Sequence, residues 1–276
     1  MQGNSDTTVV AWAGDGGTFD IGLQALSGAA ERNEDFLYVC LDNEGYMNTG
    51  AQLSYSTPIG NRTSTSEVGK ADTGKRYHHK DTAQIFTACH IPYVCTVAES
   101  NPRDMVRKAA KAQKYADEQG LVFVKMISMC PLAWRTEERV SVPIIQAAVD
   151  CCFFPLYEVE NGITTLNYDP EEKGKKVPVT EWLKQMGKTR HMLKPDCKPE
   201  LDRFQAEVDR LRREEPGFED AYLSHVADQL DGALLGRVDR HLAGDPAVDP
   251  EVRQAGQGSV DLGEVASYLR HQGGQL

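Results

Sequence analysis

A glycine-rich turn between a predicted strand and a predicted helix constrains this chain more than any other feature. The turn reads Gly14-Asp15-Gly16-Gly17; it follows the apolar run 8–12 and precedes a helical pattern over residues 18–32. Glycines at such a turn let backbone N–H groups approach a phosphate, and the N-terminus of the helix favours the anion. Asp15, however, repels a phosphate unless a cation lies between them. Because Mg²⁺ commonly binds through one or two protein oxygens plus phosphate oxygens, the turn predicts a diphosphate bridged to the protein by a metal ion.

A second segment offers a further metal ligand. Asn43 follows the apolar run 36–41, which is typical of a buried parallel strand, and its side chain can supply a neutral amide oxygen. In open α/β sheets, ligands bind beyond the carboxyl ends of the strands. Residues 14–17 and 43–49 both lie at such ends, so we expect them to converge on one ligand.

The turn has two other interpretations. The dinucleotide fingerprint Gly-x-Gly-x-x-Gly matches Gly14 and Gly16, but it would place the bulky Phe19 where close helix–strand packing needs a small residue. A plain glycine-rich turn with a solvated Asp15 is the other interpretation, and the presence of Asn43 argues against it. The metal-bridged diphosphate is therefore favoured.

The alternation of apolar runs and helical patterns predicts an α/β fold with a doubly wound, mainly parallel sheet. Asn101 reads as a helix N-cap followed by Pro102 at the first helical position. Asn161-Gly162 between two short apolar runs predicts a β-hairpin. The predicted strands are 8–12, 36–41, 92–97 and 121–127, and the predicted helices are 18–32, 82–88, 102–118, 142–151 and 179–186.

The composition changes near residue 196. Residues 196–276 hold most of the net charge of −11, and apolar residues recur there at helical spacing in two stripes. We expect an α/β domain over residues 1–195 and an acidic helical extension over residues 196–276. The pattern leaves open whether the stripes pack on the chain's own body or on a partner subunit. The first stripe is Leu201, Phe204, Val208 and Leu211, and the second is Phe218, Tyr222, Val226, Leu230, Leu234 and Val238.

The composition also argues against several classes of function. A net charge of −11 argues against a nucleic-acid partner. No run of about eighteen apolar residues occurs, so we expect no transmembrane helix and no membrane association. The first residues lack a basic segment followed by an apolar stretch, and so do not predict a secretory signal. The seven cysteines, an odd number placed mostly in apolar runs, suit free thiols in a reducing cytoplasm.

The turn and the residues after it resemble the thiamine diphosphate motif, in which Gly-Asp-Gly is followed after a fixed gap by Asn. Over residues 7–205 the chain resembles the β subunits of pyruvate:ferredoxin oxidoreductases and related 2-oxoacid:acceptor oxidoreductases. This resemblance implies a thiamine diphosphate-binding α/β domain. The motifs that carry it are Gly14-Asp15-Gly16-Gly17-Thr18-Phe19-Asp20-Ile21-Gly22, Asp42-Asn43-Glu44-Gly45-Tyr46-Met47-Asn48-Thr49-Gly50, Ser56-Thr57-Pro58, Val68-Gly69-Lys70, His90-Ile91-Pro92-Tyr93 and Cys130-Pro131-Leu132-Ala133-Trp134.

The resemblance implies roles for individual residues. Asp15, Asn43 and the backbone carbonyl of Gly45 would hold Mg²⁺. Asn48 would contact the substrate, although an Asn that only holds its own loop is an equally open interpretation. The residues implied to bind the cofactor are Gly14, Asp15, Gly16, Gly17, Thr18, Asn43, Gly45, Asn48 and Thr49.

The same resemblance implies the reaction and its partners. A 2-oxoacid would be oxidatively decarboxylated to an acyl-coenzyme A and CO₂, with ferredoxin or a similar carrier accepting the electrons. The loop from Tyr46 to Gly50 favours pyruvate, while an aromatic 2-oxoacid such as phenylglyoxylate stays open. In thiamine enzymes a Glu bonded to the aminopyrimidine comes from the facing domain, so an α/γ-type partner subunit is expected to supply it. Glu44 directly follows a metal ligand, and we do not expect it to take that role.

The resemblance also implies an iron–sulfur cluster. Cys130 aligns with the late ligand of a [4Fe–4S] cluster, which takes four thiolates. The other family ligands lie upstream of the thiamine motif, and no cysteine precedes Gly14 here. The chain is then truncated, or another polypeptide supplies these ligands, or the cluster is lost. A non-oxidative decarboxylase and a non-catalytic assembly subunit are the rival functions. The adjacent pair Cys151-Cys152 is expected to be core packing, and His78-His79 a polar loop before an N-cap at Asp81.

Overall fold

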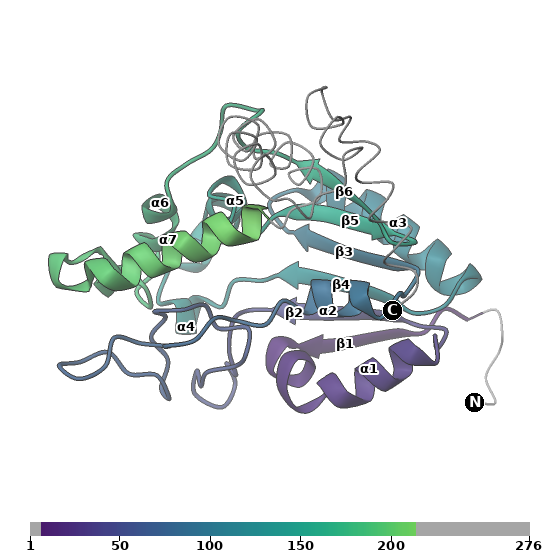
Figure 1. Ribbon diagram of the computed structural model, residues 1–276, viewed down its shortest axis with the longest axis horizontal. Helices are drawn as coiled ribbons and strands as arrows, with labels where there is room; N and C mark the ends of the chain where they lie inside the picture. The colour runs from purple at the N-terminus through teal and green to yellow at the C-terminus, as the bar shows by residue number, and fades with distance from the viewer. Residues whose placement is uncertain (1–6, 214–276) are drawn as a thin grey trace, which may run out of the picture. The chain divides into compact units, whose positions relative to one another are not determined.

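A computed structural model of the protein describes residues 7–213 (Figure 1). The chain divides into two compact units, Met1–Glu219 and Asp220–Leu276, and the second lies outside the described residues. The first unit contains a six-stranded sheet of order β1-β2-β4-β3-β5-β6. The first four strands in that order are mutually parallel, and the last two pair antiparallel. The strands are β1 (Val10–Gly14), β2 (Leu37–Asp42), β3 (Tyr93–Ala98), β4 (Val122–Ile127), β5 (Leu156–Glu160) and β6 (Ile163–Tyr168).

Helices cover both faces of the sheet. Successive side chains of a strand point to opposite sides, so β2 and β4 pack against helices on both faces. Cys40 and Phe123 pack against α1 (Leu23–Glu31) and α2 (Thr82–Ala88) on one face, whereas Val39 and Val124 pack against α3 (Pro102–Glu118) on the other. This arrangement confirms the predicted doubly wound, mainly parallel α/β fold. The helical segments are η1 (Gly16–Ile21), α1 (Leu23–Glu31), α2 (Thr82–Ala88), α3 (Pro102–Glu118), α4 (Pro131–Trp134), η2 (Glu138–Val140), α5 (Ser141–Asp150), α6 (Val179–Leu183), η3 (Arg190–Leu193), η4 (Pro195–Cys197) and α7 (Lys198–Arg213).

Local capping explains several of these boundaries. The side chain of Asp81 accepts a hydrogen bond from the backbone of Gln84 at the start of α2, and Asn101 caps α3 in the same way. Both caps were predicted. Asn161 and Gly162 both have positive φ, 49° and 83°, which is what a two-residue hairpin turn between β5 and β6 requires.

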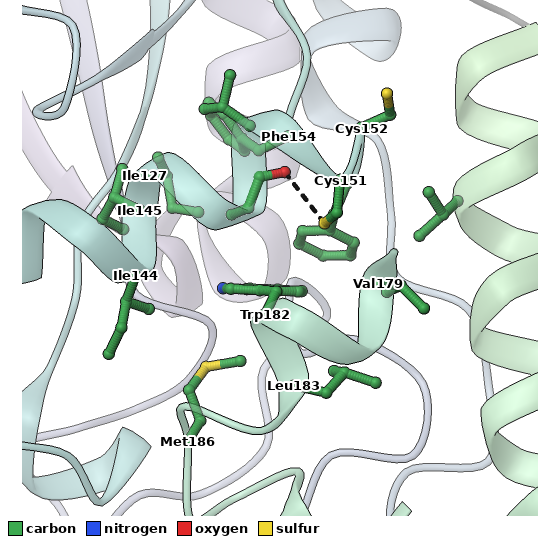
Figure 2. Close-up of a cluster of buried hydrophobic side chains, with 14 of the residues drawn as sticks. Ile127, Ile144, Ile145, Cys151, Cys152, Phe154, Val179, Trp182, Leu183 and Met186 are labelled. Carbon is green, nitrogen blue, oxygen red and sulfur yellow. Dashed lines mark hydrogen bonds between the residues drawn. The ribbon is translucent and has the colours of Figure 1, made fainter. Parts of the chain in front are cut away.

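A hydrophobic cluster lies beyond the carboxyl ends of β3 and β4, enclosed by α5, α6 and α7 (Figure 2). The rings of Phe153 and Trp182 stack with centroids 4.4 Å apart, and Phe204 of α7 packs on Phe153 at 5.5 Å. Cys151 and Cys152 are buried in this cluster, where the Cys151 thiol donates to the carbonyl oxygen of Ala148 (Figure 2). The prediction that this pair is core packing is confirmed.

The structure corrects one predicted element. The pattern over 18–32 predicted a single helix, but the chain forms a π-helical turn, η1, and then α1. A Cβ at Gly22, where the two meet, would lie 2.1 Å from the carbonyl oxygen of Gly17, so this junction needs a glycine. Such π turns often occur at functional sites.

The C-terminal predictions are resolved only in part. Phe204 and Val208 of the first stripe are buried in the chain's own core, Leu201 packs against it, and Leu211 is buried as well. The second stripe, from Phe218 to Val238, lies outside the described residues, and the predicted boundary between 1–195 and 196–276 stays a prediction. Among the helices of residues 7–213, none combines the length and the apolar character needed to cross a bilayer.

Candidate functional site

The predicted site residues meet at the carboxyl ends of β1 and β2. These strands are adjacent and parallel, with Gly14 opposite Leu41, so the turn after β1 faces the loop after β2. In Figure 1 the arrowheads of the four parallel strands point toward the side that holds α4, α6 and α7. A cavity of about 220 Å³ opens between the two segments. It is lined by Gly14, Asp15, Gly16, Gly17, Asn43, Gly45, Tyr46, Met47, Asn48 and Thr49.

The side-chain amide of Asn43 lies within coordination range of the other two predicted metal ligands. One of its two terminal atoms is 2.9 Å from Asp15 Oδ1 and 2.9 Å from the carbonyl oxygen of Gly45; it is an oxygen in one orientation of the amide and the NH₂ in the other. Neighbouring oxygens around an octahedral Mg²⁺ with bonds of about 2.1 Å are about 3 Å apart. Three oxygens so placed repel one another unless a cation lies among them or the amide is reversed so that its NH₂ donates to both. The donor set therefore fits Mg²⁺.

Charge around Asp15 also fits a cation. Asp15 is buried, and Ser54 donates a hydrogen bond to its Oδ2. Burial, and then the neighbouring Asp42, raise the pKa of Asp15 to about 8. Nearby, Asp42 Oδ2 lies 3.5 Å from Lys125 Nζ. A divalent cation beside Asp15 would favour its ionised form.

Asp15 differs from the other buried carboxyl groups at these strand ends in its partners. Asp42 is paired with Lys125 and Glu44 with Lys188, whereas within residues 7–213 no ion pair is formed by Asp15, which is bonded by Ser54. Buried charges need partners to be tolerated. At Asp15 a metal ion would provide the positive partner.

The glycine turn is shaped by a packed aromatic ring. The hydroxyl of Tyr46 donates to the carbonyl oxygen of Gly16 at 3.0 Å. A Cβ at position 16 would stand 2.3 Å from Tyr46 Cε1, so only glycine fits there without moving the ring. The ring thus holds the turn against the loop after β2.

Three residues that were predicted to bind the cofactor lie in different surroundings; they are Asn48, Thr49 and Thr18. Asn48 and Thr49 line the cavity and are exposed, as residues that meet a ligand would be. The hydroxyl of Thr49 donates to Gln52 Oε1 at 2.5 Å. Thr18 is fully buried; its hydroxyl donates to the carbonyl oxygen of Gly14 at 2.8 Å, and it is not among the lining residues. A hydroxyl contact from Thr18 to the diphosphate is therefore not what this geometry favours.

Glu44 and Cys130 lie beside the cavity and do not line it. Glu44 is buried and its carboxylate accepts from the ammonium of Lys188. Burial raises the pKa of Glu44 and lowers that of Lys188, and each partner's charge partly offsets the effect on the other. Cys130 lines a neighbouring cavity of about 250 Å³ that shares Met47 with the first. Over residues 7–213, no three His, Cys, Asp or Glu side chains are grouped as a metal site would need, so the cluster role of Cys130 stays a prediction.

Sequence reasoning missed the residues that support the metal loop, which we define as Asp42–Gly45. Ser56 donates to Asp42 Oδ1, and the indole N–H of Trp134 donates to the carbonyl oxygen of Asn43 at 2.9 Å. Ser56 and Trp134 stand in motifs that carry the resemblance, but their role was not predicted; a lysine inside the apolar run 121–127 was a further signal, since Lys125 needs a buried anion as partner. Nothing in the sequence paired Lys188 with Glu44.

The long segment between β2 and α2 is tied down at several points. Lys75 and Lys80 donate to the carbonyl oxygens of Thr57 and Phe19, the latter at 2.8 Å. His79 Nδ1 lies 2.7 Å from Glu207 Oε1 of α7, and His78 contacts the same carboxylate. The pair His78-His79 thus holds α7 to this segment, in keeping with the polar-loop interpretation.

Comparison with known proteins agrees with this geometry. Residues 1–126 match the family model described as "Thiamine pyrophosphate enzyme, C-terminal TPP binding domain". The chain is 41% identical over 213 residues to "Ketoisovalerate oxidoreductase subunit VorB" of Pyrococcus horikoshii, covering 77% of this chain and 67% of that one. It is 43% identical over 202 residues to "Pyruvate synthase subunit PorB" of Thermotoga maritima, covering 73% and 60%.

A solved structure with a lower likeness is the 2-oxoglutarate:ferredoxin oxidoreductase from Magnetococcus marinus with 2-oxoglutarate, coenzyme A and succinyl-CoA bound. The match covers 80% of this chain and 68% of that structure's chain at 19% identity, with a TM-score of 0.41.

The fold, the arrangement of the turn and the metal loop, and identities above 40% to two such subunits lead to one conclusion. The chain belongs to the family of 2-oxoacid:ferredoxin oxidoreductase β subunits, oxidoreductase subunits with a thiamine pyrophosphate-binding domain.

Proposed function

We propose that this chain binds thiamine diphosphate through a Mg²⁺ ion held by Asp15, Asn43 and the carbonyl oxygen of Gly45. The observation that carries the proposal is the 2.9 Å spacing of the Asn43 amide from the other two oxygens. Gly14, Gly16 and Gly17 line the same cavity, where their small size leaves room for the diphosphate.

The proposed reaction is the oxidative decarboxylation of a 2-oxoacid to an acyl-coenzyme A and CO₂, with ferredoxin or a similar carrier as electron acceptor. When bound, thiamine diphosphate supplies the carbanion and electron-sink chemistry of decarboxylation. This chain's own residues anchor and orient the cofactor: Asp15 and the metal loop grip the diphosphate end, and Asn48 at the exposed rim faces the substrate side. The binding of Mg²⁺ and the transfer of the acyl group to coenzyme A are both part of this proposal.

A partner subunit is part of the proposal. The carboxylate of Glu44 is bound by Lys188 and is fully buried, so it is unsuited to meet the aminopyrimidine of the cofactor. An α/γ-type subunit would supply that Glu and complete the cavity.

Pyruvate is the first substrate candidate, supported by the Tyr46–Gly50 loop and by the pyruvate synthase relatives. The relatives named as ketoisovalerate oxidoreductase subunits favour a branched-chain 2-oxoacid as the second candidate. Reduction of ferredoxin by the assembled complex, measured with each acid at equal concentration, separates the two. A higher kcat/KM for pyruvate supports the first, and a higher value for 2-oxoisovalerate supports the second.

The binding proposal is tested by Asp15→Ala in the assembled complex. Calorimetry should show thiamine diphosphate binding that depends on Mg²⁺ in the wild type and is lost in the variant. Asp117→Asn is a matched control, because the Asp117 carboxylate is exposed and contacts Thr8 near the other end of β1. Unchanged binding by Asp15→Ala would refute the assigned role, and a wild-type complex that never binds the cofactor would favour a non-catalytic assembly subunit.

A further inference from the structure

The metal loop contains a strained residue between its two metal ligands. Glu44 has a φ of 69°, in the left-handed region. For a residue other than glycine this conformation is unfavourable, because Cβ lies too close to the following carbonyl oxygen. Because Glu44 separates Asn43 from Gly45, this turn is what lets an amide side chain and a backbone carbonyl face the same point.

Specific contacts hold Glu44 in that conformation. Its backbone N–H donates to Asp42 Oδ1 at 3.1 Å, and its carbonyl oxygen accepts from Thr57 Oγ1 at 2.7 Å. Its carboxylate accepts from the ammonium of Lys188, and the side chains of both are almost wholly buried. The carbonyl oxygen and the carboxylate of Glu44 are thus fixed from outside the metal loop, and its N–H is fixed by Asp42 within it.

Lys188 links Glu44 to a second support of the metal loop. The Lys188 ammonium lies 3.8 Å from the ring centroid of Trp134, a cation–π distance. The indole N–H of Trp134 donates to the carbonyl oxygen of Asn43 at 2.9 Å. The segment before Lys188 is tied to the same residue, since the N–H of Gly187 donates to the carbonyl oxygen of Trp134 at 2.9 Å. One buried ammonium therefore contacts both the carboxylate of Glu44 and the ring of Trp134, the residue that holds the Asn43 carbonyl oxygen.

We propose that Lys188, acting through Glu44 and Trp134, is a positioning residue that fixes the metal loop in the conformation that presents its oxygens to the cation. This inference rests on the proposed function. It adds to the site a residue, Lys188, that lies 144 positions from Glu44 in the sequence. Residues that orient metal ligands typically change metal affinity 10- to 100-fold when they are lost.

Replacing Lys188 changes the stability of the fold as well as the position of the metal loop, and the variants are chosen to separate these two effects. Lys188→Met leaves the Glu44 carboxylate buried and unpaired, which is strongly destabilising by itself. Glu44→Gln combined with Lys188→Met removes both charges and should recover much of the lost stability. Lys108→Met is the matched control, because Lys108 is also a fully buried lysine, 2.8 Å from Asp104, on α3.

The experiment measures, for each assembled complex, the Mg²⁺ concentration that gives half-maximal thiamine diphosphate binding by calorimetry, and the Tm without cofactor. We expect Lys188→Met to raise that Mg²⁺ concentration about tenfold or more. The double variant should regain Tm while its Mg²⁺ requirement stays raised. Lys108→Met should lower Tm and leave the Mg²⁺ requirement unchanged.

The outcomes decide between the two roles. An unchanged Mg²⁺ requirement in Lys188→Met overturns the proposal, and so does a double variant that regains both Tm and the wild-type Mg²⁺ requirement. If Lys188→Met does not assemble, the double variant decides alone: a raised requirement supports positioning and a wild-type value refutes it. Failure of the proposed function is distinguishable, because the wild-type complex itself would then show no Mg²⁺-dependent binding.

Discussion

The ring of Tyr46 lies so close to Gly16 that a Cβ at position 16 would stand 2.3 Å from the Cε1 atom of that ring. The two residues come from different loops, one after β1 and one after β2, and the Tyr46 hydroxyl bonds to the Gly16 carbonyl oxygen at 3.0 Å. Because both residues line the cavity, the fit between them sets its shape.

Gly16→Ala should therefore weaken cofactor binding. The added methyl group displaces the Tyr46 ring toward the cavity, and we expect the Kd for thiamine diphosphate, measured by calorimetry at saturating Mg²⁺, to rise about tenfold, or roughly 1.4 kcal/mol. Gly69→Ala is the control, because a Cβ at Gly69 meets no atom within 4 Å. A Gly16→Ala complex with wild-type Kd would show that the ring moves at no cost.

Acid should loosen the contact between α7 and the segment before α2. Burial alone would raise the pKa of Glu207, but hydrogen bonds and charge from His79 and His78 outweigh it and lower the pKa to about 2 from its ordinary 4.5. A depressed pKa stabilises the fold above pH 4.5 and loses that contribution as pH falls toward 2. We expect Tm to fall over this range, and Glu207→Gln to flatten the fall.

Glu207→Gln should also lower Tm at neutral pH, by an amount equivalent to about 1–3 kcal/mol, because a buried charge-assisted contact is lost. Asp202→Asn on the same helix is the control, since the Asp202 side chain is 60% exposed. If Glu207→Gln and wild type lose stability in parallel on acidification, Glu207 is not the group responsible.

Phe204→Ala should detach α7 from the core. Phe204 is 1% exposed and packs against both Phe153 and Trp182. Removing a buried phenyl ring costs about 3–5 kcal/mol, so we expect a large drop in Tm and faster proteolysis within Lys198–Arg213. Leu132→Ala, at a residue that is 86% exposed, should change neither. Retained protease resistance in Phe204→Ala would contradict this account of the packing.

The cluster role of Cys130 has a direct test. If Cys130 supplies one of the thiolates of a [4Fe–4S] cluster, Cys130→Ser should lower the iron content of the purified complex and alter its EPR spectrum. Cys89→Ser serves as the control, because Cys89 packs against the core formed by α1 and α2. Equal iron in Cys130→Ser and wild type would exclude this ligand.

The parts of the fold set by local patterns could be predicted from the sequence. The apolar runs became β2, β3 and β4 within a residue or two, and the caps at Asp81 and Asn101 set the starts of α2 and α3 where they were expected. The convergence of Asp15 and Asn43 followed from the parallel order of strands. Each of these features depends on residues close in sequence or on a general rule of sheet topology.

Contacts between distant segments could not be predicted in this way. The pairing of Glu44 with Lys188 joins residues 144 positions apart, and that of His78 with Glu207 joins residues 129 apart. No periodicity encodes such partners, because they arise only when α6, α7 and the segment before α2 are packed together. The π-helical turn η1 was missed for a different reason. Gly17 and Gly22 are only five positions apart, but the pattern of the sequence does not indicate their close approach.

The central claim is that Asp15, Asn43 and Gly45 hold a divalent ion that binds the diphosphate of the cofactor. Crystals of the assembled complex grown with thiamine diphosphate and Mn²⁺ in place of Mg²⁺ test it through anomalous scattering. We expect one anomalous peak at a coordination distance of about 2.1 Å from oxygens of all three residues, with the amide oxygen of Asn43 turned toward it. A bound cofactor whose metal peak lies away from these residues, or an Asn43 amide whose NH₂ donates to Asp15, would contradict the account.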